Sequence, residues 1–267
     1  MFAGIDVGSL TAKAVLINDD GMTFSFIKET GDNPKKSGEK VFEEVMRKAA
    51  INKTDIKYII GTGYGRISLS FVDKTVTELT CHAKGAHYLN PAIRTLIDIG
   101  GQDSKVIKLN QNGSMADFVM NDKCAAGTGR FLEVMAGALK IDLKEMGDFS
   151  LRSNNPCVIN SICTVFAESE VVSLLAAGEN KEDIIAGLHQ GIAKRVGNMV
   201  RRLGIRDEIT FVGGVSKNSG LKNALETFLE IQFSPVGEDP QIVGALGAAL
   251  LARERYYSDR ITGSTGY

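Results

Sequence analysis

Short apolar runs separated by turn residues make up the first thirty residues of the chain. Residues 2–7 and 12–17 are apolar with a glycine turn between them, and residues 23–27 alternate weakly after the turn Asn18-Asp19-Asp20-Gly21. Runs of this length are typical of β-strands, and their close succession predicts an antiparallel meander. The next expected elements are a polar loop, an amphipathic helix, a strand and a second helix, at residues 32–38, 39–51, 58–60 and 81–89.

The same succession of strands recurs 92 residues later. A strand at 95–99 ends in Gly100-Gly101, and apolar runs at 105–109 and 115–120 flank a second hairpin turn. A single Ile-Asp-x-Gly pair could arise by chance, but the shared hairpin favours an internal duplication that produces two similar lobes facing each other. The matching heads read Gly4-Ile5-Asp6-Val7-Gly8-Ser9 and Ile97-Asp98-Ile99-Gly100-Gly101-Gln102-Asp103.

Helical spacing of apolar residues dominates the second half of the chain. Helices are expected at 128–140, 165–177, 183–203, 219–230 and 242–256, with a strand at 208–212 and a second short strand at 230–233. The predicted fold class is therefore α/β. We expect an N-terminal lobe at 1–92, completed by a C-terminal helix at about 241–257, a C-terminal lobe at 93–240, and a flexible tail at 258–267.

Composition narrows the class of protein. The 31 Lys and Arg balance 32 Asp and Glu, so no electrostatic case exists for binding nucleic acid or an anionic membrane. No apolar stretch reaches the length of a membrane span and no signal peptide is visible, so a cytoplasmic protein is expected. Four cysteines without a C-x-x-C pair argue against a disulfide framework, and the 29 glycines should mark particular turns.

A carboxylate followed at once by a glycine turn ends the first strand of each meander. In Asp6-x-Gly8-Ser9 and Asp98-x-Gly100-Gly101, glycine lets backbone N–H groups approach phosphate oxygens closely. The carboxylate is placed to hold hydrated Mg²⁺, a hydroxyl of Ser9 or Thr11 can donate to phosphate, and the Lys13 ammonium can point to the same place. The alternative is a pair of ordinary hairpin turns.

A third glycine element follows the late strand. Residues 209–212 run into Gly213-Gly214, just before a helix, and this pattern suits the close approach of a nucleoside. The sequence contains no Walker A motif and no G-x-G-x-x-G between a strand and a helix, which argues against P-loop and Rossmann folds.

Two Asp-x-Gly turns and a late Gly-Gly element resemble the superfamily of actin, the sugar kinases and the heat-shock chaperone ATPases. In that superfamily ATP lies in a cleft between two duplicated lobes. Residues 120–132 and 163–171, each containing a cysteine, sharpen the resemblance to the activator ATPases of 2-hydroxyacyl-CoA dehydratases. That family also includes ATPase subunits of benzoyl-CoA reductase. The resemblance extends from about Phe2 to Arg253, and Leu10 departs from it, because the family usually has a small hydroxyl residue there.

The resemblance implies an actin/hexokinase-like ATPase fold and a set of site residues. Catalytic roles fall on Asp6, Asp98, Gln102 and Asp103, which would hold Mg²⁺ and place the attacking water. The glycine-rich stretch 61–66 predicts a flexible turn near the cleft, and the small residues at 244–249 predict a closely packed helix face between the lobes. The residues expected to bind the nucleotide are Gly8, Ser9, Leu10, Thr11, Ala12, Lys13, Gly100, Gly101, Gly213, Gly214, Val215, Asn218 and Gln241.

Two of the cysteines are predicted to lie at helix starts. Cys124 should precede a helix that begins at Gly127 or Thr128, and Cys163 should precede the next one; a helix N-terminus stabilises negative charge. Two ligands per chain are half of what a four-iron cluster needs, and a two-fold homodimer would supply the rest. The family resemblance implies the same [4Fe–4S] arrangement. A pair of plain buried thiols and a zinc site are the alternatives.

The implied function is an ATP-hydrolysing electron-transfer activator. Its cluster would receive an electron from ferredoxin or flavodoxin and deliver it to the iron–sulfur component of a dehydratase or reductase. A metabolite kinase of the same superfamily with incidental cysteines is the main alternative, and a chaperone-like ATPase is a third. The sequence encodes no spare segment for a sugar-binding or peptide-binding insertion.

Overall fold

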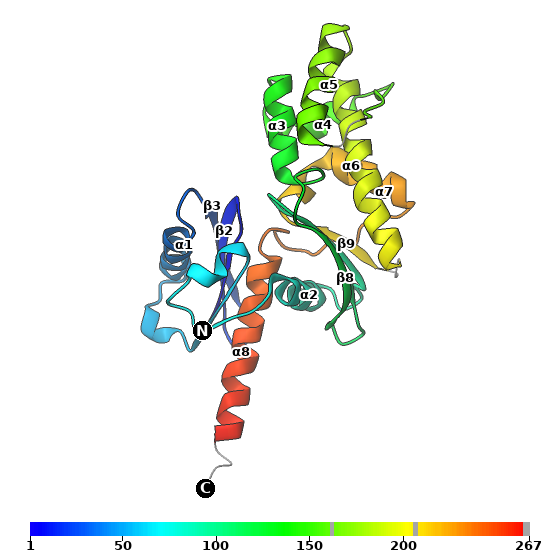
Figure 1. Ribbon diagram of the computed structural model, residues 1–267. Helices are drawn as coiled ribbons and strands as arrows, with labels where there is room; N and C mark the ends of the chain where they lie inside the picture. The colour runs from blue at the N-terminus through cyan, green and yellow to red at the C-terminus, as the bar shows by residue number, and fades with distance from the viewer. Residues whose placement is uncertain (161–162, 205–207, 264–267) are drawn as a thin grey trace. The chain divides into compact units, whose positions relative to one another are not determined.

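The described chain forms two compact units. The computed structural model describes residues 1–160, 163–204 and 208–263 (Figure 1). Unit 1 comprises Met1–Ile93, Leu109–Ala116 and the chain from Val236 onward, and unit 2 comprises Arg94–Lys108 and Asp117–Pro235.

The sheet of unit 1 has five strands in the order β3-β2-β1-β4-β5. The first three strands form the antiparallel meander predicted from the sequence, and β4 pairs in parallel with β1. Parallel pairing needs a crossover, which helix α1 (Pro34–Ala49) provides. The strands are β1 (Phe2–Val7), β2 (Thr11–Ile17), β3 (Thr23–Glu29), β4 (Tyr58–Thr62) and β5 (Lys74–Thr75).

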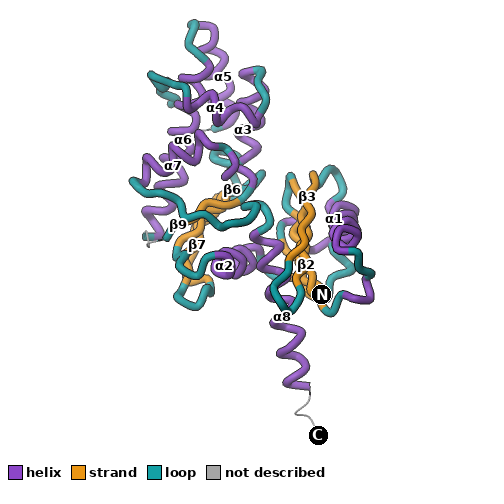
Figure 2. The backbone as a smooth tube through the Cα atoms, turned by 180° about the vertical axis from the view of Figure 1, so that it is seen from behind, coloured by secondary structure: helices purple, strands orange, loops and turns teal. Residues whose placement is uncertain are grey.

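The central strand β1 is buried on both faces, and its side chains alternate between two cores. Ala3, Ile5 and Val7 pack with α1, whereas Phe2 packs with helix α8 (Val243–Gly263) on the opposite face. The period of two places Asp6 on the α8 face as well. Figures 1 and 2 show α1 on one side of this sheet and α8 on the other.

Glycines allow α8 to approach β1 and helix α2 (Glu78–Leu89) at backbone contact. A Cβ at Gly4 would overlap the carbonyl oxygen of Ala245, and one at Gly247 would overlap that of Cys81. The small residues of α8 therefore pack against a sheet and a helix of their own unit, whereas the sequence suggested close packing between lobes.

Unit 2 repeats the strand arrangement of unit 1. Its sheet has the order β8-β7-β6-β9, in which β6 pairs antiparallel with β7 and parallel with β9. This repeat confirms the duplicated strand topology read from the sequence. The strands are β6 (Thr95–Ile99), β7 (Ser104–Leu109), β8 (Met115–Asn121) and β9 (Ile209–Val212).

Helices cover one face of the second sheet. Ile97, Ile99, Val106 and Phe211 pack with apolar side chains of five helices in a single core. These helices are α3 (Gly129–Leu139), α4 (Met146–Leu151), α5 (Thr164–Ala176), α6 (Lys181–Leu203) and α7 (Ser219–Leu229).

Several elements differ from those predicted; among them, α2 begins at Glu78 instead of residue 81, and β5 and α4 were not predicted. Helix α1 begins at Pro34 instead of residue 39, because Asn33 caps its N-terminus and proline suits the first helical turn. The predicted strand at 230–233 does not form; Ser234 makes one backbone bond to Ile209 instead of a ladder. Helix α8 continues to Gly263, through most of the predicted tail, and within it the Arg260 guanidinium lies over the Tyr256 ring. Residues 264–267 of that tail lie outside the described residues.

Across the described part of the chain, no helix combines the length and the apolar character that crossing a bilayer requires.

Replacing Gly247 by alanine should destabilise unit 1, because the new Cβ has no room against the backbone of α2. We expect a loss of about 3 kcal/mol in thermal unfolding. Gly191→Ala is the matched control: this glycine lies within α6 and has no atom within 4 Å of its Cβ position, so it should gain about 1 kcal/mol. Equal melting temperatures for the two variants would contradict the packing account.

Candidate functional site

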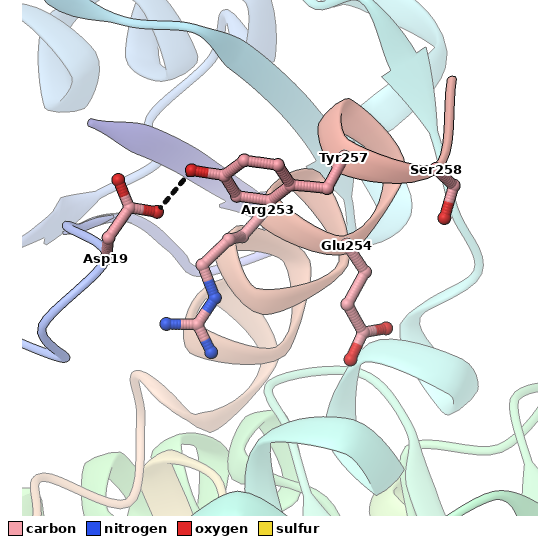
Figure 3. A pocket seen from close by; sticks show the side chains of 5 residues that line it. All are labelled: Asp19, Arg253, Glu254, Tyr257 and Ser258. Carbon is pink, nitrogen blue, oxygen red and sulfur yellow. Dashed lines mark hydrogen bonds between the residues drawn. The ribbon is translucent and has the colours of Figure 1, made fainter. Parts of the chain in front are cut away.

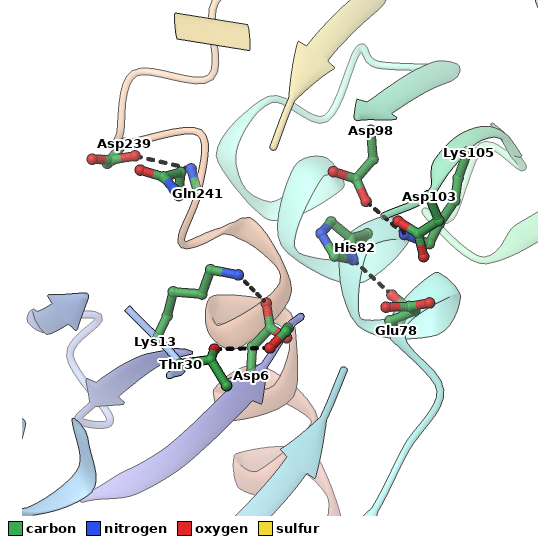
Figure 4. A network of polar contacts seen from close by, with 11 residues as sticks. Asp6, Lys13, Thr30, Glu78, His82, Asp98, Asp103, Lys105, Asp239 and Gln241 are labelled. Atoms are coloured by element: carbon green, nitrogen blue, oxygen red, sulfur yellow. Dashed lines mark hydrogen bonds and ion pairs between the residues drawn. The ribbon is translucent and has the colours of Figure 1, made fainter. Parts of the chain in front are cut away.

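The first glycine turn contains a buried ion pair. Asp6 at the end of β1 is 4% exposed and lies opposite Lys13 on β2, with 3.4 Å between Lys13 Nζ and Asp6 Oδ2 (Figure 4). The Gly8 N–H donates to the Thr11 carbonyl, and the Gly8 carbonyl accepts from the Thr30 hydroxyl at 2.8 Å. The turn is therefore held in shape from both sides.

Side chains of the other predicted residues in this turn lie in different places. Ser9, Leu10 and Thr11 are half-buried, whereas Ala12 is fully buried in the core on the α1 side. Ala12 can thus contribute only its backbone to a ligand. The Lys13 ammonium lies 3.3 Å from the point that a Cβ would occupy on Gly8, which places the cation beside the turn.

A residue that the sequence reasoning missed completes this corner. Gly63 follows β4 with φ +83°, and a Cβ there would overlap Asp6 Oδ1 and the Val7 carbonyl. Only glycine fits this conformation at so close an approach. The predicted flexible turn at 61–66 is therefore an ordered strand end followed by a 3₁₀ helix, Tyr64–Ser68, in which Arg66 donates to the Gly63 carbonyl.

The second glycine turn repeats the ion pair with an added carboxylate. Asp98 lies opposite Lys105 in the strand register, and Lys105 Nζ is 3.2 Å from Asp98 Oδ2 and 2.7 Å from Asp103 Oδ1 (Figure 4). The Gly100 N–H donates to the Asp103 carbonyl at 3.0 Å, and Gln102 is exposed. Lys105 was absent from the predicted site, although it follows Asp98 by the same seven residues that separate Lys13 from Asp6.

The Gly-Gly element lies directly beside the second turn. Gly213 has φ +85°, and its Cβ position is 2.5 Å from Asp98 Oδ1, so this residue must be glycine. Gly214 and Val215 begin a 3₁₀ helix, and Asn218 caps α7 by accepting the Leu221 N–H. The structure thus brings Asp98 and Gly213 together within one unit.

Asn218 is in turn held by a buried histidine. Its Nδ2 lies 3.2 Å from His189 Nε2, and since Asn218 Oδ1 already accepts from Leu221, the amide donates to the imidazole. His189 is fully buried, and burial lowers its pKa to about 3, so the ring is neutral at pH 7.

The start of α3 is joined to the second glycine turn. The N–H groups of Gly129 and Arg130 donate to the carbonyls of Gly100 and Gly101 at 2.9 and 2.8 Å. A Cβ on Gly129 would stand 3.3 Å from the Gly100 oxygen and 3.4 Å from Val215 Cγ2. The second glycine turn, the Gly-Gly element and α3 therefore meet at Gly129.

The two predicted cluster cysteines differ in their local structure. Cys163 is exposed and is the N-cap residue of α5, at the helix start where the sequence placed it. Cys124 is half-buried and lies five residues before α3, which begins at Gly129 rather than at Gly127 or Thr128. The helix starts later because the Thr128 N–H and hydroxyl both donate to Ala125.

Among the described residues, no three His, Cys, Asp or Glu side chains lie close enough together to hold a metal ion directly. The remaining cysteines are poor ligands: burial raises the pKa of Cys81 to about 12, and burial together with Glu179 raises the pKa of Cys157. A four-iron cluster would therefore need Cys124, Cys163 and further ligands from outside the chain.

An open pocket of about 620 Å³ lies elsewhere on unit 1, between the β2–β3 turn and α8 (Figure 3). Tyr257 donates to Asp19 across it at 2.8 Å, and Glu254 forms an ion pair with Lys84. No predicted site residue lines this pocket, which is bounded by Asp19, Arg253, Glu254, Tyr257 and Ser258.

Gln241, the last of the predicted nucleotide-binding residues, lies before α8 in unit 1, where its backbone N–H donates to Asp239 Oδ1.

Comparison with known proteins gives consistent matches over nearly the whole chain. The model of the BadF/BadG/BcrA/BcrD ATPase family matches residues 3–252. The chain is 45% identical to the 2-hydroxyisocaproyl-CoA dehydratase activator of Clostridioides difficile over 250 residues, 93% of each protein. It is 44% identical to the (R)-2-hydroxyglutaryl-CoA dehydratase activating ATPase of Acidaminococcus fermentans, over 94% of this chain and 96% of that one.

A solved structure agrees with these relatives. The Clostridium difficile activator with bound ADPNP has 43% sequence identity and a TM-score of 0.91, and the match covers 98% of both chains. The α/β ATPase fold predicted from the sequence is confirmed by this likeness.

Acid should destabilise the protein through His189. Its pKa is depressed on folding, so below pH 6.5 the unfolded chain takes up a proton that the folded chain does not, and stability falls by about 1.4 kcal/mol per pH unit toward pH 4.5. His189→Gln should flatten this dependence in unfolding measured at pH 7.0, 6.0 and 5.0. Identical pH slopes for wild type and variant would show that His189 titrates normally.

Proposed function

Since the chain belongs to the BadF/BadG/BcrA/BcrD ATPase family, we propose that it is an ATP-hydrolysing iron–sulfur activator. It passes a low-potential electron to the iron–sulfur component of a 2-hydroxyacyl-CoA dehydratase or a related reductase. The observation that carries the proposal is the presence of two Asp-x-Gly turns, each with a lysine paired to its aspartate, in a chain that also contains Cys124 and Cys163.

We assign phosphate-binding roles to the glycine turn of each unit. Asp6 and Asp98 sit at strand ends where a carboxylate can bind Mg²⁺ through water, and the Lys13 ammonium beside Gly8 can neutralise a phosphate oxygen. The exposed Gln102 and the half-buried Asp103 can orient the attacking water. Support for a nucleotide comes from the ADPNP bound to the solved relative.

Gly213 and Gly214 leave room for the nucleoside. These two residues carry no side chain that would fill the space beside Asp98, and Val215 and Asn218 follow them in the 3₁₀ helix and its C-cap. We place the adenosine here and assign Gln241 of unit 1 as a further nucleotide-binding residue.

A [4Fe–4S] cluster bound by Cys124 and Cys163 of two subunits would store the transferred electron. Thiolate sulfur is the ligand that such clusters require. Cys163 suits this role because it is exposed and lies at the N-terminus of α5, which stabilises negative charge. At Cys124, the loop is stiffened by Asn121, whose amide donates to the Cys124 and Ala126 carbonyls.

The surface around Cys163 supports a homodimer. Helix α5 exposes Val165, Phe166 and Val172, although apolar side chains of this size normally avoid water. A second copy of the chain, meeting the first across this helix, would cover them and bring two further cysteines to the two-fold axis.

The remaining assignments follow from this proposal. Ferredoxin or flavodoxin would be the electron donor, and the cytoplasm would be the location. The acyl-CoA substrate is handled by the partner enzyme. A small-metabolite kinase is not favoured, because the relatives at 44–45% identity are dehydratase activators.

Anaerobic purification tests the cluster. We expect about four irons per dimer and a brown colour, lost in Cys124→Ser and in Cys163→Ser and retained in Cys157→Ser, the matched control. Iron is measured by colorimetric assay and the cluster by its visible absorbance. A colourless wild-type protein, or iron that survives both ligand substitutions, would refute the assignment.

Charge on the exposed face of α5 should break the dimer. Phe166→Glu places a carboxylate in the proposed contact and should shift sedimentation from dimer to monomer, whereas Met22→Glu, at another exposed apolar position on unit 1, should not. A monomeric wild type, or a Phe166→Glu dimer as stable as wild type, would remove α5 from the interface.

A further inference from the structure

The duplication of the strands extends to a buried aspartate–lysine pair. Asp6 and Lys13 are cross-strand neighbours in one sheet, and Asp98 and Lys105 are cross-strand neighbours in the other. In both sheets the aspartate is the penultimate residue of an interior strand, and the positive-φ glycine that follows the parallel neighbour packs against it. The two lysines therefore occupy equivalent positions.

The two lysines have nevertheless diverged. The Lys13 side chain is 12% exposed, pairs with one carboxylate and lies beside Gly8, where a phosphate could reach it. The Lys105 side chain is 2% exposed and contacts two carboxylates, those of Asp98 and Asp103. Lys105 is thus enclosed, while Lys13 adjoins the turn.

The position of the Lys105 ammonium determines the geometry of three segments. Two carboxylates this close repel each other unless a cation lies between them, and a buried cation is costly unless it is paired. Asp98 Oδ1 lies against Gly213, and the Asp103 carbonyl accepts the Gly100 N–H. The ammonium therefore fixes the second phosphate turn and its distance from the Gly-Gly element together.

We propose that Lys105 is a positioning residue for ATP hydrolysis, which acts by holding Asp98 and Asp103 in a fixed arrangement. This inference rests on the proposed ATPase function and deepens it, because it assigns different roles to two equivalent lysines: Lys13 faces the phosphates and Lys105 orders the acids.

The test is steady-state ATP hydrolysis by the holoprotein with Lys105→Met. We expect kcat to fall about 100-fold, as for an active-site displacement of about 1 Å, while the affinity for ADPNP changes less than threefold. Lys108→Met is the matched control: Lys108 lies on the same strand, where its Nζ donates to the Leu203 carbonyl at 3.3 Å, and the variant should keep kcat within twofold. Lys105→Arg, which restores the positive charge, should have a kcat at least tenfold higher than that of Lys105→Met.

A double-mutant cycle with Asp103→Asn separates positioning from general damage. If Lys105 acts through Asp103, the second substitution should cause little further loss in the Lys105→Met background. Additive losses, a Lys105→Met enzyme within threefold of wild type, or failure of Lys105→Arg to recover activity would each overturn the inference. If Lys105→Met does not fold, Lys105→Arg replaces it in the double-mutant cycle. Non-additive losses of kcat in Lys105→Arg and Asp103→Asn then support the inference, and additive losses overturn it. Wild-type protein that binds no ADPNP would instead refute the proposed function.

Discussion

A buried aspartate at the end of the central strand is the group on which each proposed nucleotide turn depends. A carboxylate at 3–4% exposure is tolerable only beside a cation, and the antiparallel neighbour supplies one at the paired position. The parallel neighbour must then end in a positive-φ glycine, because any side chain would collide with the carboxylate. The buried aspartate thus requires the paired lysine and the glycine together, and this requirement occurs once in each unit.

Unit 2 adds to this constraint a direct connection to a cysteine segment. The first two N–H groups of α3 donate hydrogen bonds to the Gly100 and Gly101 carbonyls, and Val215 lies against the same helix start. The loop that carries Cys124 runs directly into this helix. A proposed nucleotide turn and a proposed cluster ligand therefore share one hydrogen-bonded framework, which suits a protein that couples ATP hydrolysis to electron transfer.

Short sequence patterns made much of this fold predictable. Most of the site residues that the sequence did not predict depend on which residues pair across neighbouring strands. The Asp-x-Gly turns, the duplicated meander and the late Gly-Gly element are short patterns that a sequence displays directly. Lys105 and Gly63 join the site only through cross-strand pairing, so their proximity to Asp98 and Asp6 could be found only by aligning the two repeats beyond their heads. The late start of α3 depends on bonds from Thr128 to Ala125, which spacing does not reveal.

The coupling of nucleotide hydrolysis to electron delivery is the central claim, and one rapid-mixing experiment tests it directly. The anaerobic, dithionite-reduced protein is freed of reductant and mixed with the iron–sulfur component of a 2-hydroxyacyl-CoA dehydratase while its visible absorbance is recorded. The account predicts oxidation of this protein with Mg²⁺ and ATP, and none with ADPNP or without nucleotide. Oxidation at the same rate in all three mixtures would contradict it.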